Sequence, residues 1–206
     1  MFNTVHYISQ GNTPQEQLYH IESILDAGQL WIQFRFKDAL SSVRWTTAEQ
    51  VKILCDSYKA TLLINDHPDL AQAIDADGVH LGLSDSSIAE ARKMIPNKII
   101  GGTANTLEDV RQRLAEGCDY IGLGPLRYTP TKKNLSPILG FEGYRHILTN
   151  LTEEEKKTPI IAIGGIAIED LPLLEQLELS GVAVSSLLHQ SQQPRQILQQ
   201  LKTYFL

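Results

Sequence analysis

The chain has 206 residues, a length that suits one sizeable domain with a complete hydrophobic core. Its formal net charge of -6 excludes a general basic surface for nucleic acid, so an anionic ligand must be held by local cations. We find neither a signal peptide nor an apolar run of transmembrane length, and we expect the two cysteines, Cys55 and Cys118, to be reduced and buried. Together these features predict a cytoplasmic enzyme or binding protein that acts on neither nucleic acid nor membranes.

Short apolar runs recur along the chain, and each is followed by a longer helical pattern. Eight such runs predict strands over Val5–Ser9, Leu30–Phe36, Thr61–Ile64, Gly78–Leu81, Lys98–Gly101, Tyr120–Leu123, Pro159–Ile163 and Val182–Ser185. The patterns that follow them predict helices over Pro14–Ala27, Thr46–Lys59, Pro68–Ile74, a segment after Ser87, Thr106–Glu116, Glu142–Asn150, Ile168–Leu177 and Pro194–Tyr204.

Several of the predicted helices carry capping signals at their ends. Thr13 followed by Pro14 is typical of an N-cap with proline at the first helical position. Thr46–Glu49 and Ser87–Glu90 both resemble capping boxes, in which side chains at the two ends satisfy backbone N–H groups reciprocally. Gly117 is placed to end the helix that begins near Thr106.

Strict alternation of strand and helix indicates a parallel sheet with crossover helices. Eight units in 206 residues suit a compact (β/α)8 TIM barrel, and the alternative is a doubly wound open sheet. Because we find no linker or low-complexity tract, we expect one domain over residues 1–206. In such a barrel the functional site lies at the carboxyl ends of the strands.

Alternation along the second predicted strand places Gln33, Arg35 and Lys37 on one face and Phe34 and Phe36 on the other. In a barrel the polar face would point inward, and buried cations need anionic partners, so this face would meet a ligand or carboxylates. The alternative is an edge strand with a solvated polar face, and the pattern does not decide between them.

Two aspartates follow neighbouring predicted strands. Asp66 comes after the third strand and Asp85 after the fourth, so the two carboxylates could share one Mg²⁺ ion. The alternative is that Asp66 begins a turn and Asp85 caps the next helix. We interpret His67 and His80, in the same region, as ordinary structural residues and predict no metal contact for either.

The segment Gly124–Lys133 follows the sixth predicted strand and reads Gly-Pro-Leu-Arg-Tyr-Thr-Pro-Thr-Lys-Lys. It places the hydroxyls of Thr129 and Thr131 and the ammonium groups of Lys132 and Lys133 within five residues. Such groups at the carboxyl end of a strand are suited to binding an anion, and phosphate is the expected one.

Small polar residues follow three further strands. Thr103 offers one hydroxyl after the fifth strand, and Gly165 and Ser185-Ser186 follow the seventh and eighth. Glycine lets backbone N–H groups approach a ligand, and the loops after strands seven and eight hold phosphate in many barrels. The sequence therefore predicts two anion sites, one cationic and metal-assisted and one built from amides. A reaction that joins a diphosphate substrate to a monophosphate substrate fits this arrangement.

In order and spacing, these motifs resemble those of the thiamine phosphate synthase family. The similarity runs from about residue 5 to residue 190 and rests on five segments: Gln33–Asp38, Asn65-Asp66, Gly78–Gly82 with Asp85, Gly124-Pro125 with Thr129–Lys132, and Ala162–Ile166. That family consists of (β/α)8 barrel transferases of thiamine biosynthesis that couple hydroxymethylpyrimidine diphosphate to hydroxyethylthiazole phosphate and release diphosphate. The resemblance implies this activity, with two small phosphorylated substrates as partners.

The resemblance also implies a role for each matching residue. Contacts to the pyrimidine diphosphate would come from Gln33, Arg35, Lys37, Asn65, Thr103 and Lys132. The thiazole phosphate would be held by Thr129, Thr131, Gly165, Ser185 and Ser186. Asp66 and Asp85 would bind Mg²⁺ as the cofactor, and Arg35 and Lys132 would be catalytic because they stabilise the departing diphosphate. In the dissociative mechanism of the family, the thiazole nitrogen captures a pyrimidine-methyl cation, and no general base is required.

The chain departs from the family pattern at a few positions. Phe36 stands where the family usually has glutamate, Thr103 replaces serine, Arg127-Tyr128 replaces an apolar residue and proline, and Ser185 replaces an aliphatic residue. We expect Arg127 to add a cation that alters substrate affinity or loop closure, whereas Ser185 can act through its backbone amide.

Two other functions are alternatives to the synthase. The thiazole tautomerase branch of the same superfamily carries a catalytic histidine where this chain has Pro125, and it lacks the metal aspartate after Asn65. A non-catalytic phosphate-binding barrel need not retain the aspartate pair and the cations. Both comparisons favour the synthase. The sequence does not decide the oligomeric state, and a homodimer is one option.

Overall fold

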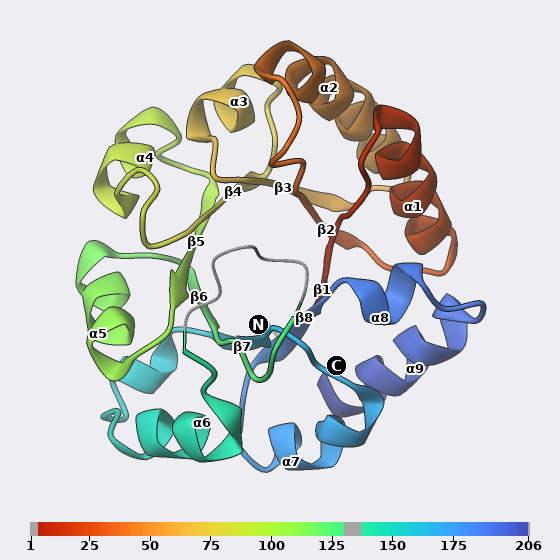
Figure 1. Cartoon of the computed structure of the whole chain (residues 1–206). Helices are drawn as coiled ribbons and strands as arrows, with labels where there is room; N and C mark the ends of the chain where they lie inside the picture. Colours follow the sequence, from red (N-terminus) through yellow and green to blue (C-terminus); the bar gives the residue numbers. More distant parts are fainter. Residues whose placement is uncertain (1–3, 130–136, 206) are drawn as a thin grey trace.

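The computed structural model of the chain describes residues 4–129 and 137–205. Within these residues, eight parallel strands pair in sequence order, and β8 pairs with β1 to close a barrel. The strands form a ring at the centre of Figure 1, and the helices surround it. The strands are β1 (Thr4–Ile8), β2 (Trp31–Phe34), β3 (Thr61–Asn65), β4 (Gly78–Leu81), β5 (Ile99–Ala104), β6 (Tyr120–Leu123), β7 (Ile160–Ile163) and β8 (Gly181–Val184). The predicted (β/α)8 barrel is confirmed, and the open-sheet alternative is wrong.

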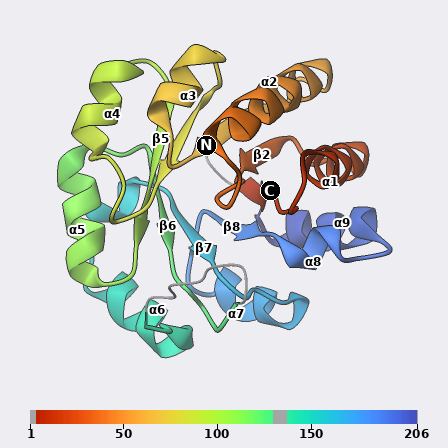
Figure 2. The same ribbon diagram turned by 45° about the horizontal axis from the view of Figure 1, so that its top comes forward.

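Helices form the outer layer of the barrel, which the turned view of Figure 2 shows. They are α1 (Pro14–Asp26), α2 (Ser41–Ser57), α3 (Pro68–Ala73), α4 (Ile88–Met94), α5 (Leu107–Glu116), α6 (Gly140–Thr149), α7 (Leu171–Glu175), α8 (Ser186–His189) and α9 (Pro194–Phe205), with short 3-10 turns at Glu155–Lys157 and Ile168–Asp170. Over the described part of the chain, none of these helices is long and apolar enough to span a membrane.

Most of the predicted helix ends agree with the structure. Thr13 caps α1 by accepting from the N–H of Glu16, and Ser87 and Glu90 form the expected capping box at the start of α4. Gly117 ends α5 in the left-handed conformation, with a φ of 76°. These ends are local in sequence, which explains why the sequence alone predicts them.

The capping box predicted at Thr46 is wrong, because α2 begins at Ser41. Thr46 lies inside the helix, and its hydroxyl donates to carbonyl oxygens of the preceding turn at 3.2 Å. Arg44 stabilises the earlier start, since its guanidinium donates to the carbonyl oxygens of Phe36 at 3.0 Å and Ala39 at 2.8 Å. The side chain therefore fastens the first turn of α2 to the loop that precedes it.

Two further differences from the prediction lie at the carboxyl ends of strands. β2 ends at Phe34, two residues before the predicted end at Phe36, so Arg35 and Lys37 belong to the loop at the barrel mouth. The short helix α8 directly after β8 was not predicted. A single helical turn of four residues shows no periodic pattern, and this accounts for the omission.

The core has two layers, separated by the strands. Leu62 and Ile64 belong to the large cluster between strands and helices, whereas Leu63 belongs to a small cluster with Tyr120 and Ile161. Because alternate residues of a strand point to opposite faces, the small cluster fills the inside of the barrel. Side chains therefore fill the barrel interior, and the site can form at the carboxyl ends of the strands.

Candidate active site

A cavity of about 770 Å³ opens at the carboxyl ends of the strands. Residues at or after the end of each of the eight described strands line it. Ten of the positions predicted from the sequence lie along its wall: Arg35, Lys37, Asn65, Asp66, Asp85, Thr103, Thr129, Gly165, Ser185 and Ser186. The fold therefore brings together residues that span most of the chain, at the end of the barrel where the site was expected.

Among the described residues, one predicted position, Gln33, does not line this cavity. Gln33 lies one layer below it, is 3% exposed, and donates from Nε2 to Oδ1 of Asn65 at 2.7 Å. Its effect is to fix the orientation of the Asn65 amide at the cavity floor. Thr131 and Lys132 lie outside the described residues.

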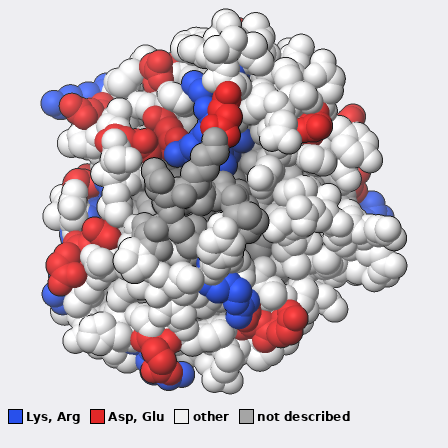
Figure 3. Space-filling view, in the orientation of Figure 1, with Lys and Arg blue, Asp and Glu red and all other residues white. Residues whose placement is uncertain are grey.

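Charged side chains gather on one side of the opening. In Figure 3, acidic and basic residues both lie over β2–β4, whereas the surface over β8 and α8 is mainly uncharged. The cationic members of this group are Arg35 and Lys37, and Lys37 forms an ion pair with Asp66 at 2.7 Å between Nζ and Oδ2. The two anion sites predicted from the sequence would fall on the two sides of this division.

Buried groups behind the wall hold the backbone of Arg35 in place. Its N–H donates to Oγ of Ser9 at 2.9 Å, and its carbonyl oxygen accepts from Nε2 of Gln17 at 3.0 Å. Ser9 and Gln17 are themselves fully buried. Burial lowers the pKa of Arg35 from its ordinary value, and the carboxylates of Asp66 and Asp38 oppose that change. A guanidinium held in this way favours a further anion beside it.

The carboxylates of Asp66 and Asp85 lie within hydrogen-bonding reach of one another. Burial raises the pKa of Asp66, the hydrogen bond from Asp85 raises it further, and Lys37 acts in the opposite direction. Asp66 also has a φ of 69°, a left-handed conformation that aspartate adopts more readily than most residues. Two adjacent carboxylates supply the oxygen ligands that a small divalent cation prefers. No cluster of three or more His, Cys, Asp or Glu side chains able to hold a metal occurs among the residues described.

The opposite wall is built from glycines and hydroxyls. Gly164 and Gly165 have φ values of 91° and 70°, and a Cβ on Gly165 would lie 2.5 Å from Cγ of Arg127. Ser185 and Ser186 mark the start of α8, where the first N–H groups have no partner within the helix. An uncharged wall of backbone amides beside serine hydroxyls suits a phosphate group.

Thr103 is connected to the interior of the barrel through His80. Nε2 of His80 lies 3.0 Å from Oγ1 of Thr103, and Nδ1 lies 2.8 Å from the Tyr120 hydroxyl. The histidine therefore has two polar partners, as expected for a structural residue, and it fixes the hydroxyl of Thr103 at the cavity floor.

Sequence reasoning overlooked several polar residues of the cavity wall. Gln10 follows β1, and its Oε1 accepts from Oγ of Ser185 at 3.4 Å. Asp38 and Asn105 also line the cavity, after β2 and β5. Each follows a strand end, so the rule that identified Asp66 and Asp85 would have identified these residues if applied to every strand.

The comparison with family models gives one match that covers most of the chain. Residues 5–188 match the family described as thiamine monophosphate synthase.

Individual proteins show the same similarity at high identity. The chain is 52% identical over 202 residues to the thiamine-phosphate synthase of Flavobacterium psychrophilum, and the alignment covers 98% of each protein. It is 48% identical over 202 residues to the thiamine-phosphate synthase of Flavobacterium johnsoniae, with 98% of this chain and 95% of that protein covered. Among solved structures, the thiamine phosphate pyrophosphorylase of Pyrococcus furiosus superposes with a TM-score of 0.83 at 27% identity, over 99% of this chain and 96% of that one.

Proposed function

The chain belongs to the thiamine monophosphate synthase family, and we propose that it joins hydroxymethylpyrimidine diphosphate to hydroxyethylthiazole phosphate to form thiamine phosphate and diphosphate. The observation that carries the proposal is one cavity with two chemically different walls. The charged wall of Arg35, Lys37, Asp66 and Asp85 suits a diphosphate, and the glycine and serine wall suits a monophosphate. A site that holds both substrates at once can bring their reacting atoms together.

The aspartate pair fits Mg²⁺ on its own chemistry. Asp66 and Asp85 approach each other closely, and burial and mutual repulsion disfavour two free negative charges there. A divalent cation resolves that repulsion, and Lys37 lies near enough to take part in the charge balance. When bound, Mg²⁺ would neutralise part of the diphosphate charge and favour its departure.

The residues of the charged wall act on the leaving group. As the C–O bond to the diphosphate breaks, negative charge accumulates on the departing oxygens, and preorganised cations stabilise that charge most. Arg35 is suited to this role because Ser9 and Gln17 hold its backbone before the substrate binds. Lys132, outside the described residues, is proposed as the second cation.

The remaining residues orient the organic parts of the substrates. Asn65, held by Gln33, and Thr103, held by His80, would contact the pyrimidine diphosphate at the cavity floor. Thr129, Gly165, Ser185 and Ser186 would hold the thiazole phosphate on the opposite wall, together with Thr131. Substrates held in this way would bring the thiazole nitrogen toward the carbon that loses diphosphate, and no side chain would need to remove a proton from that nitrogen.

A thiazole tautomerase is the second candidate, and two residues of the cavity oppose it. Pro125 lines the cavity where that activity would require a histidine, and proline cannot transfer a proton. Asp66 lines the same cavity as a carboxylate that an isomerase of this kind does not need.

The direct test is a reaction with purified protein, both substrates and Mg²⁺. We expect thiamine phosphate and diphosphate in equal amounts, measured by chromatography and a diphosphate assay. Reactions that lack the thiazole phosphate, or that contain a chelator, serve as controls and should give no thiamine phosphate. A folded protein that forms no product with both substrates and Mg²⁺ present would contradict the proposal.

The proposal extends to the cellular compartment and the oligomeric state. Cys55 and Cys118 are free and buried, which supports work in a reducing compartment such as the cytoplasm. The homodimer stays a prediction, and light scattering after size-exclusion chromatography would measure it.

A further inference from the structure

Arg113 is a charged side chain of α5 that is almost completely buried, with 3% of the side chain exposed. Arginine is rarely buried to this extent unless its donors are all engaged. Arg113 does not line the cavity, so it takes no direct part in the proposed reaction.

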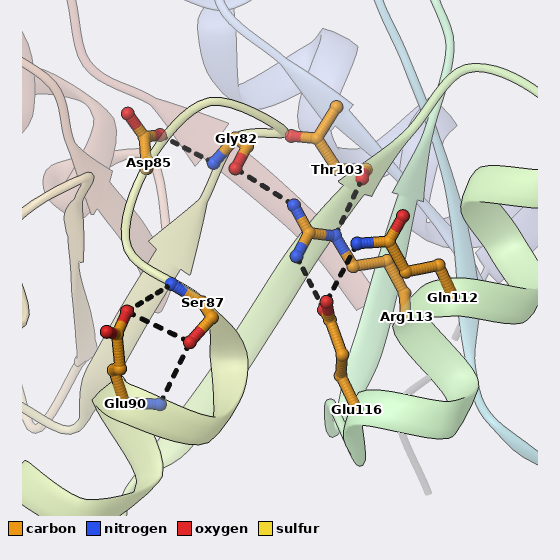
Figure 4. Close-up of polar contacts among 8 residues, drawn as sticks. All are labelled: Gly82, Asp85, Ser87, Glu90, Thr103, Gln112, Arg113 and Glu116. Atoms are coloured by element: carbon orange, nitrogen blue, oxygen red, sulfur yellow. Dashed lines mark hydrogen bonds and ion pairs between the residues drawn. The ribbon is translucent and has the colours of Figure 1, made fainter.

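The guanidinium reaches from α5 to the carboxyl ends of two neighbouring strands (Figure 4). Nε donates to the carbonyl oxygen of Thr103 at 3.1 Å, and one terminal nitrogen donates to the carbonyl oxygen of Gly82 at 2.9 Å. The other terminal nitrogen pairs with Glu116 at 2.7 Å, and Gln112 donates to the same carboxylate at 2.8 Å. Glu116 thus balances the charge of Arg113 within α5. The other two N–H groups of the guanidinium bind carbonyl oxygens at the ends of β4 and β5 and so hold the two strand ends together.

A glycine provides the room for this side chain. A Cβ on Gly102 would lie 2.7 Å from Cδ of Arg113, closer than carbon atoms approach without a shift. The Gly101-Gly102 pair before Thr103 is therefore explained in part by packing against α5, since the aliphatic part of Arg113 occupies the space beside Gly102.

Each strand end that Arg113 holds carries a residue of the candidate active site. The N–H of Gly82 donates to Oδ2 of Asp85 at 2.6 Å, and the carbonyl oxygen of Gly82 accepts from Arg113. Gly82 therefore connects Arg113 to the Asp85 carboxylate. At the other end of that loop, Ser87 is fixed by its capping box with Glu90 (Figure 4). On β5, Arg113 binds the carbonyl oxygen of Thr103, whose hydroxyl faces His80 at the cavity floor.

We infer that Arg113 is a positioning residue, which sets the placement of the Asp85 carboxylate relative to the Thr103 hydroxyl by joining the ends of β4 and β5. The inference rests on the proposed function, because it assigns Asp85 to the metal and Thr103 to the pyrimidine diphosphate. A residue that only attached α5 to the barrel would affect stability and leave the binding of Mg²⁺ and of both substrates unchanged.

The test compares three variants on separate readouts. Arg113→Met keeps the length of the side chain and removes the donors, whereas Arg113→Lys restores a charge for Glu116 but cannot reach both carbonyl oxygens. The matched control is Arg111→Met, because Arg111 lies on the same helix and also joins a carboxylate, Glu155, and a backbone carbonyl, but on the exposed side.

For Arg113→Met we expect the Mg²⁺ concentration at half-maximal turnover and the KM for the pyrimidine diphosphate to rise roughly tenfold or more, because charge-assisted hydrogen bonds are lost. The KM for the thiazole phosphate should change less than about twofold, since that wall lies on other strands. Arg113→Lys should recover thermal stability but not the Mg²⁺ dependence. Arg111→Met should match the wild-type protein in all three constants.

Hydrogen exchange of the free protein provides the readout that does not depend on activity. We expect the amides of residues 82–87 to exchange faster in both Arg113 variants than in the wild-type protein and Arg111→Met. Unchanged exchange there, or equal changes in both KM values, would overturn the inference. If Arg113→Met does not fold, Arg113→Lys decides between the same outcomes. An inactive wild-type protein would contradict the proposed function, and the exchange result would still decide whether Arg113 holds the Asp85 loop.

Discussion

The guanidinium of Arg127 forms a two-pronged ion pair with the carboxylate of Asp170, which lies 43 residues further along the chain. In one of these two contacts, Nη2 of Arg127 donates to Oδ1 of Asp170 at 2.7 Å. Nη1 of Arg127 also donates to the carbonyl oxygen of Gly165 at 3.0 Å. The sequence predicted that Arg127 would add a cation acting on substrate affinity or loop closure. In the structure its charge is neutralised by Asp170, and the side chain joins the loop after β6 to the glycine wall after β7.

Removing Arg127 should therefore disturb the phosphate wall. We expect Arg127→Met to raise the KM for the thiazole phosphate roughly tenfold, because the carbonyl oxygen of Gly165 loses its hydrogen bond from the guanidinium. The free energy of unfolding should fall by about 1 kcal/mol, at the low end for a lost ionic partner because Arg127 is 45% exposed. Steady-state kinetics and chemical denaturation measure the two effects. Arg145→Met removes an exposed ion pair with Glu142 on α6 and serves as the control. Equal KM values in both variants would show that the pair does not support the wall.

Gly165→Ala tests the same wall from the backbone. The new Cβ would lie 2.5 Å from Cγ of Arg127 and 2.9 Å from the carbonyl oxygen of Tyr128, at a φ of 70°. Gly117→Ala is a matched control, since Gly117 has a φ of 76° but no atom within 4 Å of its Cβ position. Both variants should lose roughly 1–2 kcal/mol of stability from the left-handed conformation. Only Gly165→Ala should also raise the KM for the thiazole phosphate, by roughly tenfold or more. A normal KM in that variant would remove Gly165 from the proposed site.

Asp66→Asn and Asp85→Asn test the proposed metal pair. Each change removes one negative charge and keeps the size of the side chain, and asparagine tolerates the φ of 69° at position 66. We expect turnover at limiting Mg²⁺ to fall roughly a hundredfold or more, with circular dichroism unchanged. The control is Asp75→Asn, because Asp75 also has a positive φ of 53° and an ion pair, with Lys98, but it is exposed and outside the cavity lining. Wild-type turnover in either site variant would exclude that residue as a metal ligand.

Acid should destabilise the protein through His6. The ring is buried inside the barrel, stacks on Trp31 with centroids 4.3 Å apart, and has no hydrogen-bond partner for either nitrogen among the described residues. Burial, with a smaller contribution from His80, lowers the pKa of His6 from 6.5 to about 3. Between these values the unfolded chain binds a proton that the folded chain does not, so stability falls as the pH falls.

The slope of that loss is measurable. Each pH unit below 6.5 should cost the wild-type protein roughly 1.4 kcal/mol from this group alone. Denaturation of His6→Phe over the same pH range should show a shallower slope, because the side chain no longer titrates. Parallel slopes for wild-type and His6→Phe proteins would show that His6 is not responsible.

Features that depend on neighbouring residues were predictable from the sequence. Strand and helix alternation gave the barrel, and the Ser87 capping box and Gly117 gave the ends of α4 and α5. Because a barrel places its site at the strand ends, the sequence alone identifies the polar residues after those ends as candidates. Where a short-range signal met a competing contact, as at Thr46, the prediction was wrong, since the side chain of Arg44 stabilises an earlier start.

The sequence by itself determined which residues lie at the strand ends, because apolar periodicity and capping depend on residues only a few positions apart. Only the tertiary structure decided how those residues are held. Arg127 meets Asp170 across 43 residues, and Arg113 meets Gly82 across 31, contacts that no local pattern specifies. The physical reason is that closing the barrel sets each strand beside the next and packs α5 against them. A buried guanidinium then binds whichever carbonyl and carboxylate oxygens that geometry places within its reach.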